Sequence, residues 1–421
     1  MKKNIAVIIL AAGKSTRMNS QRPKVLHPLC SRPMLGYVLD LAEGLRANRI
    51  ITVLGHKHQE VRKILKPKIK VVRQRRLLGT ADGVKAALPL LGNFKGTVLI
   101  LCADTPLLKK KTITDLLESH AENQHDATLL TAQLNNPQGY GRILRDKYAS
   151  ICGIVEENDA DDFQKEIKEI NTGIICFKKE SLIRALKYIK PHNRKKEYYL
   201  TDAIGILYKN GSLVDNVKVS DTQEILGINS RAELAQANKV MQRRIHEALM
   251  KAGVAIIDPD STFISYNAKI GRDTVIYPFT VIEKDVRIGK FCSIGPFAHV
   301  REVSRIEDGV HIGNFVEIAR SRVKRNTSIR HFGYIGDSRI GKMANIGAGT
   351  ITANFDGKKK NATVIKDKAF IGSDTVLIAP VTIGRNAVTG AGSVVTRNTN
   401  VPEGATVVGV PARVLKRRGK L

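Results

Sequence analysis

The sequence contains no tryptophan, and aromatic residues make up only 5% of its 421 positions. Cysteine is also scarce, because the five cysteines are scattered, odd in number and never spaced as Cys-x-x-Cys. This pattern argues against a disulfide framework or a cysteine zinc site and indicates a reducing compartment, the cytoplasm. No apolar run approaches the roughly 20 residues that a membrane-spanning helix needs, so we expect no membrane span. The apolar run after Met1-Lys2-Lys3 imitates a signal peptide, but we expect a first β-strand there.

Acidic residues are in the minority: 39 Asp and Glu stand against 69 Lys and Arg, a net charge of +30. Such a charge favours anionic partners and weak binding of nucleic acid at low salt. The basic residues are spread along the chain in short runs, however, and no RNA-binding motif with interleaved aromatics is present. We therefore predict phosphate-bearing small substrates and no specific nucleic-acid partner. A basic nucleic-acid-binding protein is the least favoured alternative.

A chain of this length exceeds one ordinary hydrophobic core, so two domains are expected. Residues 1–227 alternate apolar with amphipathic segments, which predicts an α/β, Rossmann-like domain with a mostly parallel sheet. Residues 228–252 are expected to form a linker helix, because Ser230-Arg231-Ala232-Glu233 has the pattern of a capping box. The strands expected in the first domain are Ile5–Leu10, Ile50–Leu54, Ile69–Val72, Thr97–Leu101 and Ile174–Phe177, and the clearest amphipathic stretches are Pro33–Arg46 and Thr112–His120.

From Ile264 to Ile318, an aliphatic residue occupies every sixth position. The pattern shifts by one residue near Val323, shifts again before Ile340, and continues to Ile383. A period of six is typical of a left-handed parallel β-helix, in which three hexapeptide repeats form one triangular coil. We assign residues 253–421, including a basic C-terminal tail, to this domain. The basic excursion between Ile351 and Val364 is expected to be a loop that carries function.

The most informative motif is an apolar strand that runs into the turn Leu10-Ala11-Ala12-Gly13 and is followed by two cations, Arg17 and Lys24. Small residues let backbone N–H groups approach phosphates, while the cations neutralise phosphate charge. The spacing of a Walker loop is absent. Taken alone, the motif also fits an ordinary turn with exposed basic residues.

Two further segments narrow the chemistry. Asp104 follows the apolar strand that ends at Cys102, so it lies at the carboxyl edge of the expected sheet, where it can hold Mg²⁺ against phosphate oxygens. A loop cap without a metal is the alternative. The segment Leu78-Gly79-Thr80-Ala81 begins a helix after Gln74 and offers backbone N–H groups to a base or a phosphate.

The motifs occur in a fixed order: Leu-Ala-Ala-Gly-x3-Arg-Met, Pro-Lys-Val-Leu, Leu-Gly-Thr, Asp-x-Pro-Leu, Gly-Tyr-Gly-Arg, Gly-Ile-Val-Glu, Ile-Asn-Thr-Gly and Glu-Tyr-Tyr-Leu-Thr-Asp. This order resembles that of the sugar-1-phosphate nucleotidyltransferases. With the hexapeptide domain behind it, the chain is similar to the bifunctional N-acetylglucosamine-1-phosphate uridylyltransferase/glucosamine-1-phosphate acetyltransferase family.

The resemblance implies two reactions and a set of ligands. One reaction transfers UMP from UTP to N-acetylglucosamine-1-phosphate and releases pyrophosphate, and the other acetylates glucosamine-1-phosphate from acetyl-CoA. It also implies Mg²⁺, a homotrimer and a cytoplasmic location.

In the first domain, the resemblance implies roles position by position. Arg17 and Lys24 would be catalytic, and Asp104 and Asn229 would hold the metal. The nucleotide would contact Leu10, Ala11, Ala12, Gly13, Lys24, Gln74, Gly79 and Thr80. The sugar phosphate would contact Gly139, Glu156, Asn171 and Asn229. The family commonly has Tyr-Gly where this chain has Cys102-Ala103.

In the second domain, the resemblance implies that His331 is the catalytic base and that Glu317, next to it, orients the ring. The other substrate-binding positions would be Arg301, Tyr334, Asn345, Asn354 and Lys360. Acetyl-CoA would contact Ala348, Ser373, Ala391 and Arg413.

Two substitutions and the length of the β-helix depart from the family. The phosphate-binding lysine expected two residues after Glu317 is Ala319, and the tyrosine of the loop is Phe355. Arg320 is adjacent but is expected to point to the opposite side of its strand. The hexads also indicate a β-helix about two coils shorter than in known members. An alternative is therefore a nucleotidyltransferase whose β-helix serves only as a trimerisation scaffold.

Overall fold

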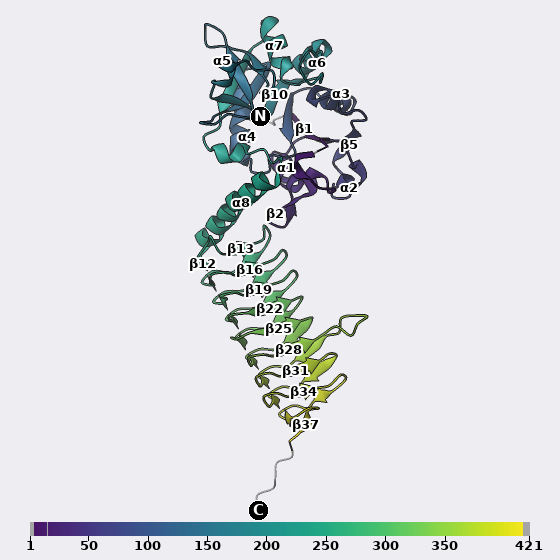
Figure 1. The fold of residues 1–421 in the computed structure, drawn as a ribbon, viewed down its shortest axis with the longest axis vertical. Coiled ribbons are helices and arrows are strands. Elements are labelled where there is room, and N and C mark those ends of the chain that lie inside the picture. The colour runs from purple at the N-terminus through teal and green to yellow at the C-terminus, as the bar shows by residue number, and fades with distance from the viewer. Residues whose placement is uncertain (1–3, 15, 416–421) are drawn as a thin grey trace, which may run out of the picture. The chain divides into compact units, whose positions relative to one another are not determined.

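The computed structural model describes residues 4–14 and 16–415 and divides the chain into two compact units, Met1–Val240 and Met241–Leu421 (Figure 1). The predicted linker helix is α8 (Arg231–Lys251), which crosses this boundary. Its capping box forms as expected: the Glu233 backbone nitrogen donates to Ser230 Oγ, and the Ser230 backbone nitrogen donates to Glu233 Oε2. The basic tail at 416–418 lies outside the described residues. Among the described residues, no helix is long and apolar enough to cross a membrane, and the five cysteines are free.

The first unit is built on one mostly parallel sheet in the order β11-β7-β10-β6-β1-β4-β5. β1 pairs in parallel with β4 and β6, whereas β10 runs antiparallel to β6 and β7. The expected strands are confirmed. The strands are β1 (Ile5–Ala11), β4 (Arg49–Leu54), β5 (Lys70–Arg73), β6 (Thr97–Cys102), β7 (Ala127–Gln133), β8 (Gly141–Arg145), β9 (Ile151–Val155), β10 (Glu169–Lys178) and β11 (Val214–Lys218), with a small hairpin of β2 (Pro28–Leu29) and β3 (Arg32–Pro33).

Helices cover both sides of this sheet. Val7 and Ile9 of β1 belong to one buried cluster, whereas Ala6 and Ile8 belong to a second cluster, because alternate side chains of a strand point to opposite faces. Burial on both faces is typical of a doubly wound α/β fold. The helices are α1 (Met34–Gly44), α2 (His58–Arg62), α3 (Thr80–Leu91), α4 (Lys110–Glu122), α5 (Asp162–Lys165), α6 (Lys179–Tyr188) and α7 (Asp202–Lys209), with short 3-10 helices η1 (Thr16–Met18), η2 (Lys24–Leu26) and η3 (Thr222–Ile225).

The second unit is a stack of triangular coils with three flat faces (Figure 1). The first face contains β12 (Ala255–Ile256), β15 (Val275–Ile276), β18 (Ser293–Ile294), β21 (His311–Ile312), β24 (Ser328–Ile329), β27 (Asn345–Ile346), β30 (Phe370–Ile371), β33 (Val388–Thr389), β36 (Thr406–Val408) and β37 (Arg413–Val414). The second face contains β13 (Phe263–Ile264), β16 (Val281–Ile282), β19 (His299–Val300), β22 (Val316–Ala319), β25 (Gly333–Gly336), β28 (Ile351–Ala353), β31 (Val376–Ile378) and β34 (Val394–Val395). The third face contains β14 (Lys269–Ile270), β17 (Arg287–Ile288), β20 (Arg305–Ile306), β23 (Arg322–Val323), β26 (Ser338–Ile340), β29 (Thr363–Ile365), β32 (Val381–Ile383) and β35 (Asn400–Val401).

The hexad residues form the core of this β-helix. Ile264, Ile282, Val300 and Ile318 pair coil to coil and are fully buried. The shift near Val323 is one shortened coil, because Ile306 pairs with Val323, 17 residues on, instead of 18. The predicted left-handed parallel β-helix of hexapeptide repeats is thereby confirmed.

The corner between the first and second faces carries an exposed row of phenylalanines, which we call the phenylalanine edge. The rings of Phe279, Phe297 and Phe315 stack with centroids 4.8 and 5.0 Å apart, and Phe332 follows on the next coil. These four side chains are 45–60% exposed. A contiguous exposed apolar row of this kind is typical of an interaction surface.

Candidate active sites

A cavity of about 450 Å³ opens at the carboxyl ends of β1 and β6. Of the residues predicted to bind the nucleotide or metal, seven line it: Leu10, Ala12, Gly13, Gln74, Gly79, Thr80 and Asp104. The sequence reasoning did not assign the remaining lining residues, which are Lys14, Leu77, Gly83, Cys102 and Glu197. Glu197 begins the Glu-Tyr-Tyr-Leu-Thr-Asp motif, so its place in that motif was the available signal.

The Gly79 turn is held by the segment that follows Glu197. The Tyr198 backbone nitrogen donates to the Leu78 carbonyl, the Ala81 nitrogen donates to the Tyr198 carbonyl, and the Leu200 nitrogen donates to Thr80 Oγ1. Gly79 has φ +120°, and a Cβ there would overlap the Tyr198 backbone, so only glycine fits. Gln74 Nε2 donates to the Gly79 carbonyl and to Asp82, which fixes the amide at the cavity wall.

The predicted metal ligands converge on one cation. Lys24 Nζ lies 2.6 Å from Asp104 Oδ2 and 2.9 Å from Asn229 Oδ1, although the three residues are far apart in the sequence. The Lys24 and Asp104 side chains are 12% and 26% exposed. An ammonium therefore sits between a carboxylate oxygen and an amide oxygen at the mouth of the cavity. Cys102 lies beside Asp104. Burial, followed by the charge of Asp104, raises the pKa of the Cys102 thiol to about 12, so this part of the cavity wall carries no charge.

Three residues predicted to bind the nucleotide, Ala11, Arg17 and Lys24, do not line the cavity. Arg17 is exposed on η1, and Ala11 is buried at the end of β1. The cation of this segment that lines the cavity is Lys14.

Of the predicted sugar residues, Gly139 precedes β8, Glu156 follows β9, Asn171 lies on β10 and Asn229 precedes α8. Glu156 Oε1 accepts a hydrogen bond from Thr201 Oγ1 at 2.9 Å, and burial raises the pKa of the Glu156 carboxyl. The Gly173 backbone nitrogen donates to Asn171 Oδ1 at 3.1 Å, and Gly139 donates through its backbone nitrogen to Glu157. None of Gly139, Glu156 and Asn171 lines the described cavity.

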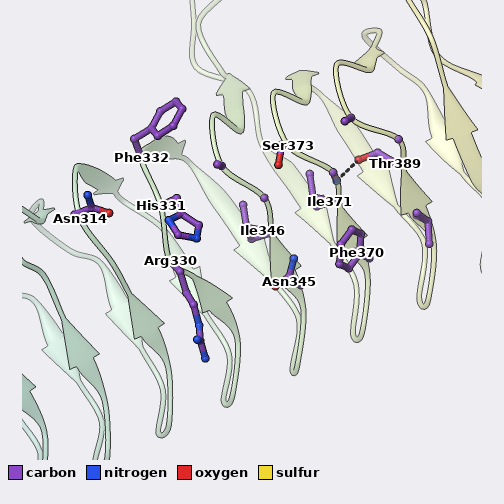
Figure 2. Close-up of a pocket in the computed structure, with 16 residues that line it drawn as sticks. Asn314, Arg330, His331, Phe332, Asn345, Ile346, Phe370, Ile371, Ser373 and Thr389 are labelled. Carbon is purple, nitrogen blue, oxygen red and sulfur yellow. Dashed lines mark hydrogen bonds between the residues drawn. The ribbon is translucent and has the colours of Figure 1, made fainter.

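A second cavity, of about 750 Å³, lies on the first face of the β-helix (Figure 2). His331 lines it at the corner between β24 and β25, and Asn345 and Ser373 follow on successive coils. Ala348 and Ala391 also line it. The structure therefore gathers the predicted base and three of the predicted acetyl-CoA residues in one groove. Residues that the sequence did not assign complete the lining, chiefly Asn314, Arg330, Phe332 and Phe370.

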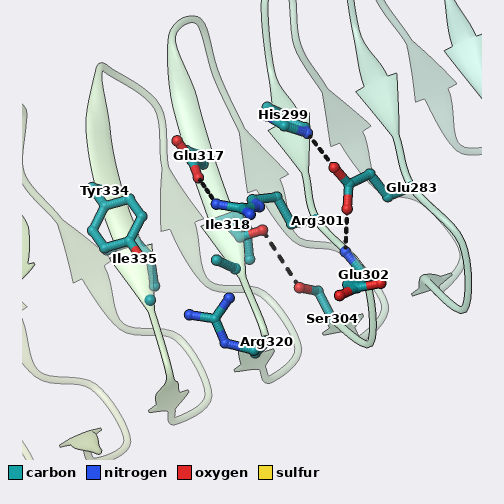
Figure 3. Close-up of polar contacts among 12 residues, drawn as sticks. Glu283, His299, Arg301, Glu302, Ser304, Glu317, Ile318, Arg320, Tyr334 and Ile335 are labelled. Carbon is teal, nitrogen blue, oxygen red and sulfur yellow. Dashed lines mark hydrogen bonds and ion pairs between the residues drawn. The ribbon is translucent and has the colours of Figure 1, made fainter. Parts of the chain in front are cut away.

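The structure does not place Glu317 on His331. Glu317 instead accepts a hydrogen bond from Arg301 Nη1 at 3.0 Å and pairs in register with Tyr334 (Figure 3). Among the described residues, no hydrogen bond joins the Glu317 carboxylate to the His331 ring. The expected orienting contact is therefore absent in the isolated chain, because Glu317 points outward from the second face while His331 lies at the corner.

Arg320 corrects a sequence expectation. It lies one residue beyond β22, with φ +49°, and strand alternation no longer governs its direction there. Its guanidinium forms a two-point ion pair with Asp337, with both N–O distances 2.8 Å, and both Asp337 and Tyr334 raise the pKa of Arg320. Asn354 Nδ2 donates to Asp337 Oδ2 and Tyr334 Oη. Ala319, which replaces the expected lysine, is fully buried. Arg320 therefore joins the predicted sugar-phosphate residues instead of facing away from them.

The excursion after β28 brings a further cation to this cluster. The pKa of Asp337 is lowered chiefly by its hydrogen bond to Arg320, and the charge of Lys360 contributes, so Lys360 lies near. The loop is braced by Asp356, which accepts from the backbone nitrogens of Lys358 and Lys359 and from Arg397. Arg413 does not join either group, since it pairs with Val408 on β36 and does not line the cavity.

An α/β unit with a cavity at its strand ends, followed by a hexapeptide β-helix with a groove around a histidine, defines a two-domain transferase. Comparisons with known proteins agree. Residues 7–167 match the MobA-like NTP transferase domain, and three stretches, residues 267–302, 285–320 and 362–397, match the bacterial transferase hexapeptide repeats.

The chain is 43% identical to the bifunctional protein GlmU of Geobacillus sp. (strain WCH70), over 97% of this chain and 96% of the relative. It is also 43% identical to the protein of the same name from Heliobacterium modesticaldum and 42% identical to that from Thermosipho africanus, again over 97% of this chain. The chain therefore belongs to the GlmU family, and it is a bifunctional enzyme, a nucleotidyltransferase and an acetyltransferase.

The first of these alignments also bears on the length of the chain. Its 442 positions include 97% of the 421 residues here, so about 34 positions of the relative have no counterpart.

Proposed function

We propose that the first unit transfers UMP from UTP to N-acetylglucosamine-1-phosphate and releases pyrophosphate. The cavity at the ends of β1 and β6 supports this, since it combines a small-residue turn with Lys14 and Lys24 at one sheet edge. A phosphate oxygen of the sugar attacks the α-phosphorus in line, and pyrophosphate leaves. Such a step needs positioning and charge neutralisation, not a covalent intermediate. Lys24 neutralises the triphosphate, Arg17 approaches from η1, and Gln74 and Gly79 flank the base.

We propose that Asp104 and Asn229 hold Mg²⁺ in this site. Their donor set fits, because a carboxylate oxygen and an amide oxygen already converge on one cation, the Lys24 ammonium. Bound Mg²⁺ supplies further neutralisation of phosphate charge. Lys24 then exchanges Asp104 for the phosphates, a change of partner that its flexible side chain allows. Glu156 and Asn171 bind the sugar.

We propose that the second unit acetylates glucosamine-1-phosphate with acetyl-CoA as donor, and this step supplies the substrate of the first unit. The substrate amine attacks the thioester carbonyl, His331 accepts the amine proton, and coenzyme A leaves as the thiol. Asn345, Ala348, Ser373 and Ala391 line the groove for the donor.

We propose that Arg301, Arg320 and Lys360 bind the phosphate of this acceptor, with Tyr334 and Asn354. In place of the lysine that is Ala319 here, Arg320 supplies a cation. The guanidinium of Arg320 donates to Asp337 through Nε and Nη2, and we propose that Nη1 donates to the substrate phosphate.

We propose a homotrimer in which the phenylalanine edge is covered by a second copy. The edge runs through Phe332, next to His331, so a neighbouring chain seated there completes the wall of the acetyl-transfer groove. This also explains why the Glu317 carboxylate and the His331 ring do not meet within one chain.

The observation that carries the bifunctional proposal is the groove that joins His331 to three acetyl-CoA positions. Purified protein is incubated with glucosamine-1-phosphate, acetyl-CoA, UTP and Mg²⁺, and thiol and pyrophosphate are measured separately. Both are expected to form, and His331→Ala is expected to lose thiol release while retaining uridylyl transfer from supplied N-acetylglucosamine-1-phosphate. Pyrophosphate that forms only with supplied N-acetylglucosamine-1-phosphate indicates the alternative, a nucleotidyltransferase with a scaffold β-helix, which the loss of the lysine at Ala319 favours.

A further inference from the structure

The third face of the β-helix carries a straight row of cations. Lys269, Arg287, Arg305, Arg322 and Arg339 occupy the same outward position on five successive coils and pair directly in register. All five are exposed. We call this row the basic ladder. Neither the nucleotide cavity nor the acetyl-transfer groove includes any of these residues.

The ladder is nearly without counterions. Arg322 pairs with Glu307 at 2.7 Å, but no hydrogen bond or ion pair is recorded for the side chains of Lys269, Arg287, Arg305 and Arg339 with any described residue. Neighbouring strands lie about 4.8 Å apart, and like charges directly opposite one another are destabilising. The arrangement therefore lowers the stability of the free β-helix and is relieved by a bound anion.

At its C-terminal end, next to Arg339, the ladder opens into a cavity of about 650 Å³ that Gly341 also lines. Gly341 lies in register between Lys324 and Lys366, and a Cβ there would overlap the Asp367 backbone, so the coils pack closely at this glycine and no side chain stands between the cations. The cations that surround it are Arg322, Lys324, Arg339, Lys366 and Arg385, against two carboxylates, Asp367 and Glu403. Asp367 already accepts the Lys342 backbone nitrogen. The cavity is thus a recess with more cations than carboxylates.

The shape of the ladder indicates the kind of anion. Five coils span about 19 Å in a single file, which suits a chain of phosphates better than a plane of lipid headgroups. The outward positions of these five strands carry no aromatic side chain that could stack on bases, and the apolar residue next to the ladder is a single valine, Val364. A flexible single strand can follow a straight row, whereas the phosphates of a duplex curve away from it.

We propose that the basic ladder and the Gly341 recess bind single-stranded nucleic acid through its phosphates, independently of base sequence. This goes beyond the transferase activities and does not depend on the residue roles proposed for them. In a triangular coil the third face lies opposite the phenylalanine edge, so it remains uncovered when a second copy covers that edge. The charge excess that the sequence showed as scattered is thus partly concentrated on one face by the fold.

The test measures the anisotropy of a labelled 20-nucleotide single-stranded DNA of mixed sequence with the full-length protein, from 50 to 200 mM salt. The ladder variant is Arg287→Ala/Arg305→Ala/Arg339→Ala. The matched control is Lys187→Ala/Lys190→Ala/Lys209→Ala, which removes the same charge from exposed positions of the first unit. Each phosphate contact contributes about −0.7 to the slope of log K against log salt. The ladder variant is expected to reduce the slope by about 2, and the control to leave it nearly unchanged.

Three results overturn the proposal. In the first, the wild-type protein does not bind the oligonucleotide at 50 mM salt. In the second, the two triple variants lose the same affinity for the oligonucleotide, which assigns binding to overall charge. In the third, the ladder variant loses affinity for anionic phospholipid vesicles but not for the oligonucleotide, which assigns the face to membranes. Both enzyme activities are measured in every variant and are expected to equal those of the wild type, since none of these residues belongs to either active site.

Discussion

The two active sites of this chain are built in opposite ways. In the first unit, a carboxylate, an amide and a lysine from distant parts of the chain converge within 2.9 Å at the closed edge of one sheet. In the β-helix, the His331 groove and the cluster of Arg301, Arg320 and Lys360, for which we propose phosphate binding, lie on adjoining faces at an exposed edge. A sheet edge enclosed by its own helices can complete a site from one chain. The rim of a solenoid has no second wall, so its site depends on what packs against it.

The strongest test of this comparison is Asp104→Ala in the self-contained site. Removal of the carboxylate leaves Lys24 without its partner and the proposed metal without a ligand, so we expect uridylyl transfer to fall by about 10³-fold or more. Pyrophosphate release reports this step. Acetyl transfer, measured as thiol release from the same preparation, should stay at the wild-type rate, since Asp104 does not line the groove around His331. An intact rate of pyrophosphate release would refute the assignment.

The second test disrupts the phenylalanine edge of the β-helix instead. Phe315→Glu places a charge in the middle of the phenylalanine edge, where its ring stacks 5.0 Å from Phe297. We expect the proposed trimer to dissociate and thiol release to fall by about 10²-fold, with uridylyl transfer unchanged. Light scattering gives the mass and the two assays give the rates. Tyr148→Glu, at an exposed aromatic residue of the first unit, is the control and should change neither. A monomer with full acetyl transfer would contradict the shared site.

A smaller effect is expected from Arg320→Ala. The loss of a charge-assisted hydrogen bond costs about 1.5–3 kcal/mol, which corresponds to a 10- to 100-fold rise in KM for glucosamine-1-phosphate. The KM for acetyl-CoA should not change. Ala319→Lys in the Arg320→Ala background restores a cation next to the same cluster and should recover most of the loss. No rise in KM, or a fall in kcat alone, would make the Arg320–Asp337 pair purely structural.

The sequence predicted the parts of this molecule that repeat or alternate. The six-residue spacing of aliphatic residues from Ile264 to Ile318 predicted the β-helix, because inward residues must recur once per face to fill a triangular core. The strands β1 and β6 were readable because both of their faces are buried. The convergence of Asp104 and Asn229 was predicted as well, although only from resemblance to a family.

The errors fall where local geometry departs from the repeat. Arg320 has a positive φ at a corner, and strand alternation fails one residue beyond the strand. Glu317 was expected on His331, but a residue on a face and a residue at a corner point in different directions. The basic ladder was invisible as a row because its members are 17 or 18 residues apart in the sequence. Such features follow from coil geometry, which no local window of sequence contains.

The two units also differ in how they hold acids, and this predicts opposite responses to pH. Burial, followed by the charges of Glu156 and Asp159, raises the pKa of Asp202 in the first unit to about 6. In the β-helix, the backbone N–H of Lys359 first, followed by Asn361, Lys358 and Arg397, lowers the pKa of Asp356. An acid with a raised pKa destabilises the fold once it ionises, whereas an acid with a lowered pKa stabilises it, and both effects disappear as the pH falls.

Asp202→Asn should therefore stabilise the protein by about 1–3 kcal/mol above pH 6, with the gain shrinking between pH 6 and pH 4. Asp356→Asn should do the reverse, since it removes a stabilising charge that matters at neutral pH and is lost in acid. Thermal unfolding of both variants and the wild type at pH 4 and pH 7.5 measures the differences. If Asp202→Asn gives the same shift at both pH values, its effect comes from packing at the start of α7 and not from the buried charge.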